Sequence, residues 1–91
     1  MDISAIRNRV LAIQEDLSYF DDLVKTKMRY EVNLWGIRQQ MQLPDSQEQE
    51  LEELQATENE LLRRISNCQS LLERTREKLL KSLGVKSDNN R

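Results

Sequence analysis

The side chains that most often perform catalysis or bind metals are sparse in this chain, and their spacing forms no known catalytic arrangement. The sequence contains no histidine, so it lacks the commonest general base and the commonest metal ligand. Glu52 and Glu53 are adjacent, so on a helix their carboxylates point to different sides. No Gly-rich phosphate loop, His-containing metal motif or EF-hand loop occurs. We therefore expect no enzyme activity, no catalytic, cofactor or metal site, and no small-molecule substrate.

Cys68 is the only cysteine, and a thiol is the one nucleophile of note. Its place in an apolar helical stripe favours a small buried hydrophobe, with a reactive or intermolecular thiol as the alternative. Secreted domains of this size usually carry paired cysteines. No secretory signal is recognisable, and the longest apolar run near the start, Val10–Ile13, is too short to span a bilayer. We therefore expect an intracellular protein, cytoplasmic or nuclear, without membrane insertion.

Charged residues make up 33% of the chain, yet the net charge is only −2. The acidic block over residues 48–60 contains no positive residue. It indicates a solvated helix face favoured by the helix dipole, with contact to a basic partner as the alternative. In the second half Glu73 and Glu77 interrupt the basic residues, and no aromatic residue lies among them to stack on bases. We therefore do not expect nucleic-acid binding.

Pro44 divides the chain into two halves, each dominated by good helix formers. The sequence predicts an all-α hairpin over residues 1–84, with helices at about 3–41 and about 46–83, a turn at about 42–45, and a polar flexible tail at 85–91. We expect Asp2 to cap the first helix, Asp45 or Ser46 to cap the second, and Gly84 to follow its end. Gly36 is expected to mark close packing or a bend beside Trp35, or to end the first helix early.

Apolar residues in both halves recur at alternating spacings of three and four, the pattern of a coiled-coil seam. In the first helix this frame fails at Lys27 and Glu31, and a shift to Met28, Val32 and Trp35 restores it. The second helix keeps one frame, with Glu58 and Thr75 as its polar members. The predicted seam of this antiparallel two-helix coiled coil consists of Ile6, Val10, Ile13, Leu17, Phe20, Val24, Leu51, Leu54, Leu61, Ile65, Cys68, Leu72 and Leu79.

Charge favours the antiparallel orientation. A turn near Pro44 places opposite each other residues whose numbers sum to about 87. This register pairs opposite charges, which selects an orientation more than it adds stability. The expected facing groups are Asp21 and Asp22 with Arg63 and Arg64; Lys25, Lys27 and Arg29 with Glu58 and Glu60; and Glu15 and Asp16 with Arg74.

Apolar residues beyond the seam indicate that two helices are not the complete assembly. A wide apolar stripe is typical of bundles with three or four helices. We therefore expect the half nearest the turn to dock on a second copy or on another helical protein. Trp35 is either an anchor for this contact or a cover for the hairpin's own core. The predicted partner-binding residues are Leu23, Met28, Tyr30, Trp35, Ile37 and Leu62.

These features predict a non-catalytic coiled-coil subunit for protein–protein interaction, a small structural component of a larger helical assembly. By analogy of class alone, such chains serve cytoskeletal, chromosome-segregation or trafficking scaffolds. The alternatives are a homodimeric four-helix-bundle module and a small regulatory or chaperone-like binder.

Overall fold

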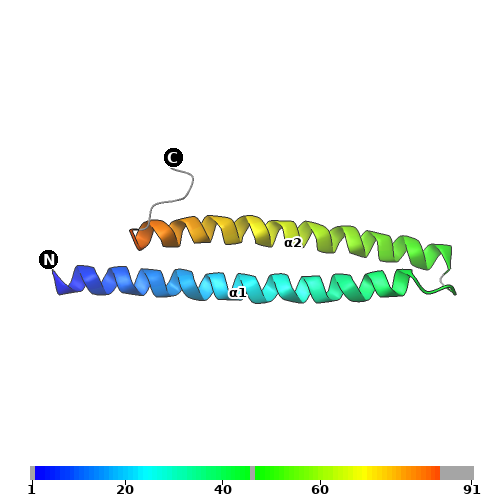
Figure 1. Ribbon diagram of the computed structural model, residues 1–91, viewed down its shortest axis with the longest axis horizontal. Helices are drawn as coiled ribbons and strands as arrows, with labels where there is room; N and C mark the ends of the chain where they lie inside the picture. Colours follow the sequence, from blue (N-terminus) through cyan, green and yellow to red (C-terminus); the bar gives the residue numbers. More distant parts are fainter. Residues whose placement is uncertain (1, 46, 85–91) are drawn as a thin grey trace.

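Two long helices joined by a short turn make up the fold. The structure is a computed structural model that describes residues 2–45 and 47–84. Helix α1 spans Ile3–Met41 and helix α2 spans Glu48–Ser82. The chain reverses between them, so the start of α1 lies near the end of α2 (Figure 1). The all-helical fold with two long helices is confirmed, and the described residues contain no strand. The expected flexible tail, 85–91, lies outside the described residues.

The two free helix ends are built as the sequence predicts. Asp2 is the N-cap of α1, and its Oδ1 accepts a hydrogen bond of 3.2 Å from the Ser4 amide. This bond satisfies an amide that the first helical turn leaves unpaired. At the end of α2, Gly84 has a φ of +76°, a conformation that glycine adopts without steric cost. Its amide donates to the Lys81 carbonyl and closes the helix.

The structure decides two points about the helices near the turn that the sequence leaves approximate or open. Helix α2 begins at Glu48, later than expected, and its N-cap is Gln47, whose side chain makes no capping hydrogen bond. The expected capping box from Asp45 to Glu48 is therefore not formed, and Ser46 lies outside the described residues. Gly36 does not end α1, which continues for more than a turn beyond it to Met41.

Helix α2 presents to α1 the frame that the sequence predicts. Leu61, Cys68, Thr75 and Leu79 are buried, and the remaining members of that frame are half-buried. The Thr75 hydroxyl donates to the Leu71 carbonyl at 2.8 Å, so this buried polar group is satisfied within its own helix. The members of the frame are Leu51, Leu54, Glu58, Leu61, Ile65, Cys68, Leu72, Thr75 and Leu79.

Helix α1 uses a different frame from the predicted one. Its buried and half-buried residues keep the spacings of three and four without any shift, because Lys27 occupies a seam position. The Lys27 ammonium lies 3.8 Å from the Glu31 carboxylate while its stem is half-buried, as expected for a long amphipathic side chain. The expected shift to Met28, Val32 and Trp35 is wrong, since all three are exposed. The observed frame consists of Ile13, Asp16, Phe20, Leu23, Lys27, Tyr30, Leu34, Ile37 and Met41.

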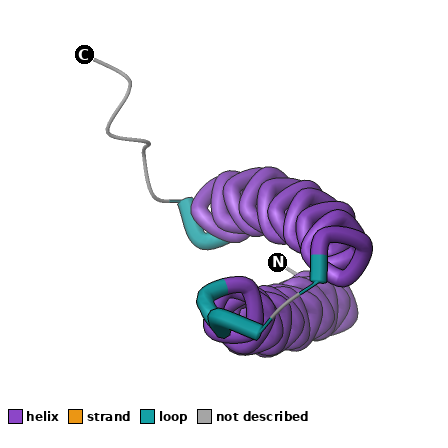
Figure 2. The backbone as a smooth tube through the Cα atoms, turned by 90° about the vertical axis from the view of Figure 1, so that its right-hand side faces the viewer, coloured by secondary structure: helices purple, strands orange, loops and turns teal. Residues whose placement is uncertain are grey.

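The register of the two helices differs from the expected one by about one heptad. The Lys78 ammonium donates to Asp16 at 3.1 Å, and the Arg38 guanidinium donates to Glu58 at 2.9 Å. The Arg64 guanidinium lies over the Tyr30 ring, 5.7 Å from its centroid. Asp16 therefore faces Lys78 in place of Arg74. Helix α2 lies on one side of α1 and crosses it at an angle (Figure 2), and the first turns of α1 extend beyond the end of α2 (Figure 1).

Candidate protein-interaction surface

The hairpin leaves many large apolar side chains in water. Among the described residues, no large side chain is fully buried. Two helices in contact cover only one side of each other, so apolar residues on the remaining sides have no neighbour to pack on. The exposed ones form two groups on α1, one on each side of its midpoint. The surface therefore offers two separate places where another helix can dock.

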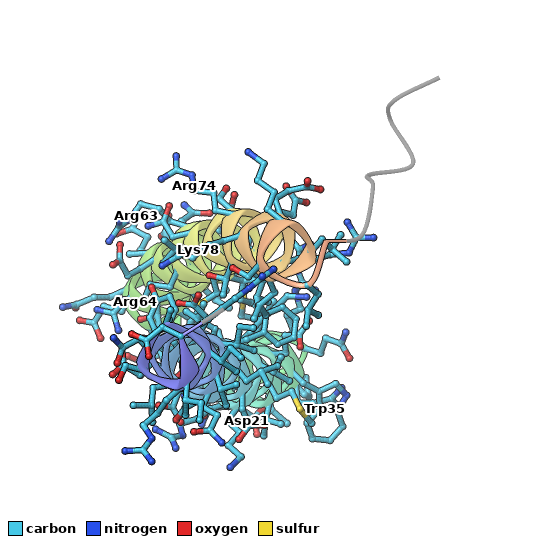
Figure 3. The ribbon with its side chains drawn as sticks, turned by 90° about the vertical axis from the view of Figure 1, so that its left-hand side faces the viewer. Asp21, Trp35, Arg63, Arg64, Arg74 and Lys78 are labelled. Carbon is cyan, nitrogen blue, oxygen red and sulfur yellow. The ribbon has the colours of Figure 1, made fainter. Side chains whose placement is uncertain are left out.

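The first group, here called the outer patch, consists of Met28, Val32 and Trp35 in the half of α1 nearest the turn. Their side chains are 57%, 67% and 66% exposed. Spacings of four and three place them on one side of α1. Trp35 extends from α1 away from α2 (Figure 3), so the hairpin cannot cover it. This patch combines an aromatic residue with two flexible or branched apolar neighbours, which is typical of an anchor in a helix-binding groove.

The second group, here called the N-terminal stripe, occupies the other half of α1 and consists of Ile3, Ile6, Val10, Ile13, Leu17 and Phe20. Ile3 is 75% exposed, and Ile6, Val10 and Leu17 are each about half exposed, whereas Ile13 and Phe20 are half-buried because they also belong to the seam. Leu83, just past the end of α2, is exposed and lines an open groove with Ile6, Val10 and Ile13. The Arg9 guanidinium donates to the Ser82 carbonyl at 2.6 Å and holds this end of α2 on α1.

The six predicted partner-binding residues separate into two sets. Met28, Trp35 and Leu62 are exposed, so they are available to a partner. Leu23 is 8% exposed and lies in the seam, and Tyr30 and Ile37 are half-buried there. The frame that includes Lys27 brings these three to face α2. Their expected place on an exposed surface is therefore corrected, while partner binding by the first three stays a prediction.

The seam prediction for α1 also needs correction. Ile13 and Phe20 lie in the observed seam and Val24 is half-buried beside it. Val10 and Leu17 lie on the exposed flank, because Leu17 comes directly after the seam residue Asp16 and Val10 precedes Leu17 by seven positions, on the same side of the helix. Ile6 falls at a seam position near the end of α2, where little of α2 remains to cover it. The apolar spacing that identifies the N-terminal stripe is visible in the sequence, where it predicts a seam and not an exposed surface.

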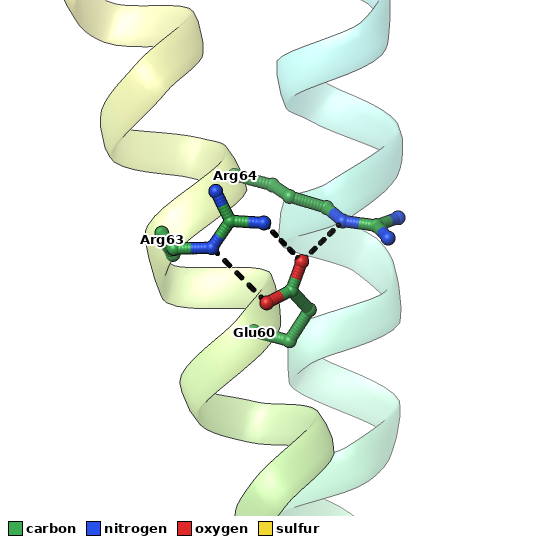
Figure 4. A network of polar contacts seen from close by, with 3 residues as sticks. All are labelled: Glu60, Arg63 and Arg64. Atoms are coloured by element: carbon green, nitrogen blue, oxygen red, sulfur yellow. Dashed lines mark hydrogen bonds and ion pairs between the residues drawn. The ribbon is translucent and has the colours of Figure 1, made fainter.

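Charged side chains on α2 are largely engaged by neighbouring carboxylates. Glu60 accepts hydrogen bonds from both guanidinium groups that follow it, including one of 3.0 Å from Arg64 Nε and one of 3.1 Å from Arg63 Nε (Figure 4). These bonds, first from Arg63 and then from Arg64, lower the pKa of Glu60 to about 2. Arg76 lies 3.3 Å from Glu77, and Lys78 bonds Asp16. These pairs engage four of the six cations of α2, which disfavours contact of this helix with a phosphate backbone.

Sites for chemistry do not emerge from the geometry of the described chain. Across residues 2–45 and 47–84, no group of acidic or cysteine side chains is arranged to hold a metal ion. Cys68 is buried in the seam. Neither helix, over its described length, has a segment long and apolar enough to cross a membrane. No protein-family model, curated protein or solved structure matches this chain. Its own surface is therefore the basis for a functional conclusion.

Proposed function

We propose that this chain is a non-catalytic coiled-coil subunit that binds other helices, and that the outer patch is its docking site for a different helical protein. The observation that carries the proposal is the exposure of Met28, Val32 and Trp35 on one side of α1, where Trp35 extends away from α2 (Figure 3). Leaving such side chains in water forgoes about 1.5–3 kcal/mol each. A partner helix that covers them recovers this free energy.

The total exposed surface supports association. The whole chain exposes 7488 Å². A compact monomer of its mass, 10.8 kDa, exposes about 5,500 Å². The difference of roughly 2,000 Å² is more than twice the approximately 800 Å² that each partner contributes to a standard interface. The chain therefore has enough uncovered surface for two contacts of ordinary size.

The mechanism of binding would be helix-in-groove packing. The apolar residues of the outer patch span two turns of α1, which matches the spacing at which one helix contacts another. Gly36 follows Trp35, and a Cβ placed there would meet no atom within 4 Å, so the backbone beside Trp35 is open to a partner. Leu62 on α2 is also exposed and adds a second apolar contact from the same half of the hairpin.

Intrinsic fluorescence tests this function directly, because Trp35 is the only tryptophan. Affinity purification from native cells, followed by reconstitution with the purified candidate, should give a complex in which the Trp35 emission shifts to the blue. Trp35→Ala should weaken this complex by at least about tenfold, since a central aromatic anchor typically contributes 2 kcal/mol or more.

Tyr19→Ala provides the matched control. Tyr19 is also an aromatic residue of α1 and is 47% exposed, but it lies in the other half of the helix. Its loss should leave the affinity within about twofold. A complex whose affinity is the same with Trp35→Ala as with Tyr19→Ala would show that the outer patch is not the docking site.

A further inference from the structure

We propose that the N-terminal stripe binds a second copy of this chain, with the two α1 helices antiparallel about a two-fold axis near residues 11 and 12. The inference shares one premise with the proposed function, namely that the chain binds other helices. It concerns a different surface, so the outer patch stays free for another protein.

The order of residue spacings along the stripe is the same in both directions. Its residues follow one another at spacings of three, four, three, four and three. When a second stripe lies antiparallel to it, Ile3 meets Phe20 of the second copy and Ile6 meets Leu17. Val10 then meets Ile13 next to the axis. Every layer pairs one apolar side chain with another, as antiparallel helix packing requires. Because a two-fold axis repeats each layer, one stripe supplies both halves of the interface.

The charges beside the stripe are self-complementary in the antiparallel orientation. Near its start lies Arg7, which is exposed and makes no ion pair within the described chain. Near its end lies Asp21, whose carboxylate extends away from α2 (Figure 3) and bonds only the exposed Lys25, at 2.9 Å. In the antiparallel dimer Arg7 of each copy lies about five residues, or about 7.5 Å, along the axis from Asp21 of the other, an offset that the long arginine side chain spans to give two ion pairs. A parallel arrangement would instead leave Arg7 of one copy about 21 Å along the axis from Asp21 of the other, too far for an ion pair.

Leu83 strengthens the centre of this interface. It lies at the level of Val10, as both line the same groove at the end of α2. The proposed axis passes close to this level, so Leu83 of both copies would flank it. An exposed leucine that the hairpin does not cover thereby becomes buried near the axis, where contacts contribute most to affinity. Each α2 ends close to the axis, so on either side of it the two α1 helices and one α2 would form a short three-helix bundle around the stripe.

Sedimentation equilibrium on the full chain tests the proposal. The wild-type chain should sediment as a dimer at protein concentrations of roughly 10–100 μM. Val10→Asp should weaken the dimer by at least about a hundredfold, because it places a carboxylate at the buried centre of the interface. Since Val10 is half exposed in the hairpin, circular dichroism should show that the variant keeps its helicity. The matched control is Leu11→Asp, which changes the next residue at similar exposure on another side of α1 and should leave the dimer intact.

A charge exchange tests whether the partner is a second copy in this orientation. Arg7→Glu and Asp21→Arg should each weaken the dimer by about three- to tenfold, because each change replaces two attractive contacts by two repulsive ones. The double variant should restore the affinity to within about twofold. Because both charges are exposed, neither change threatens the fold. Full loss in the double variant would overturn the proposed pairing.

A distance measurement separates the two orientations. Spin labels at Arg29→Cys, in a Cys68→Ala background, should lie about 50 Å apart across the antiparallel dimer. A distance below about 25 Å would indicate a parallel dimer and overturn the proposal. A monomer at all concentrations would also overturn it. Such a monomer that still bound another helix through Trp35 would leave the proposed function standing.

Discussion

At the scale of the residue, burial in this hairpin alternates sharply between neighbours. Leu61 and Leu62 are adjacent leucines of α2, yet Leu61 is 7% exposed and faces α1, whereas Leu62 is 41% exposed. The sequence distinguished them because α2 carries its apolar residues in one uninterrupted frame. In α1 the apolar pattern does not predict that Leu23 is buried in the seam. The reason is that two polar residues, Asp16 and Lys27, occupy seam positions there and interrupt the apolar spacing. Polar residues in a seam are tolerated when their charged ends reach solvent or a partner.

The two leucines give a direct test of the seam. Leu61→Asp should lower the free energy of unfolding by more than about 3 kcal/mol, because it leaves an uncompensated carboxylate among apolar side chains. Urea unfolding followed by circular dichroism measures this change. Leu62→Asp, one residue away, should change stability by less than about 0.5 kcal/mol. Equal losses in the two variants would contradict the assigned frame.

The two glycines have opposite requirements. Gly36 sits inside α1, and an added Cβ would meet no atom within 4 Å, so Gly36→Ala should stabilise the hairpin by about 1 kcal/mol. Gly84 has a φ of +76° at the end of α2, and Gly84→Ala should therefore destabilise it by about 1 kcal/mol. Thermal unfolding of the two variants should show shifts of opposite sign. A loss of stability in Gly36→Ala would show that the site needs glycine for a reason inside the hairpin.

At the scale of the element, spacing predicts which side of a helix is buried but not how two helices are aligned. A seam that repeats every seven residues looks the same after a slide of one heptad. Charge was the only sequence feature that could choose between such registers. Several ionic groups instead bond neighbours on their own helix, as Glu60 bonds Arg63 and Arg64, and so contribute nothing to alignment. This is why the frame of α2 was predictable and the register was not.

The register can be tested with the Asp16–Lys78 pair, which joins α1 to α2 at 3.1 Å. Lys78→Asp should destabilise the hairpin by about 0.5–1 kcal/mol, since two carboxylates then face each other. Adding Asp16→Lys should recover most of that loss. The same charge exchange between Asp16 and Arg74, Asp16→Lys with Arg74→Asp, should recover no stability. An interaction energy between Asp16 and Arg74 in a double-mutant cycle would instead support the register expected from the sequence.

Acid should weaken α2 through Glu60. Its pKa of about 2 in the folded chain lies below the ordinary value of 4.5, because Arg63 and Arg64 donate hydrogen bonds to the carboxylate. A lowered pKa contributes stability that is fully present above pH 4.5 and is lost as the pH falls toward 2. Glu60→Gln should therefore reduce the dependence of the melting temperature on pH within this window. The Glu60 carboxyl resonance should titrate below its usual range, and a midpoint near 4.5 would contradict the network.

At the scale of the whole molecule, the hairpin has more apolar surface than its own two helices can bury. Its two helices are long, and its extents of 68, 31 and 14 Å describe a flat rod with little interior. The fold follows from helix-forming composition and one proline, so sequence alone was sufficient for it. The proposed docking surfaces could not be predicted from the sequence, because α1 carries more apolar residues than one seam can bury. Only the structure shows which of them face α2 and which are left over at each half of α1.

The overall shape of the proposed dimer follows from the separation of the two surfaces. Pairing through the N-terminal stripe overlaps only the first halves of the α1 helices, so the two turns point in opposite directions. At 1.5 Å per residue, each turn lies about 50 Å from the axis, and the dimer is about 100 Å long. Small-angle scattering should therefore give a maximum dimension well above the 68 Å of one hairpin. Val10→Asp should return it to the value of a single hairpin, with a radius of gyration near 19.7 Å. A dimer no longer than the monomer would mean that the hairpins lie fully side by side.

In the elongated dimer the two Trp35 residues are about 70 Å apart, so each copy can hold a separate partner helix at its own end of the assembly.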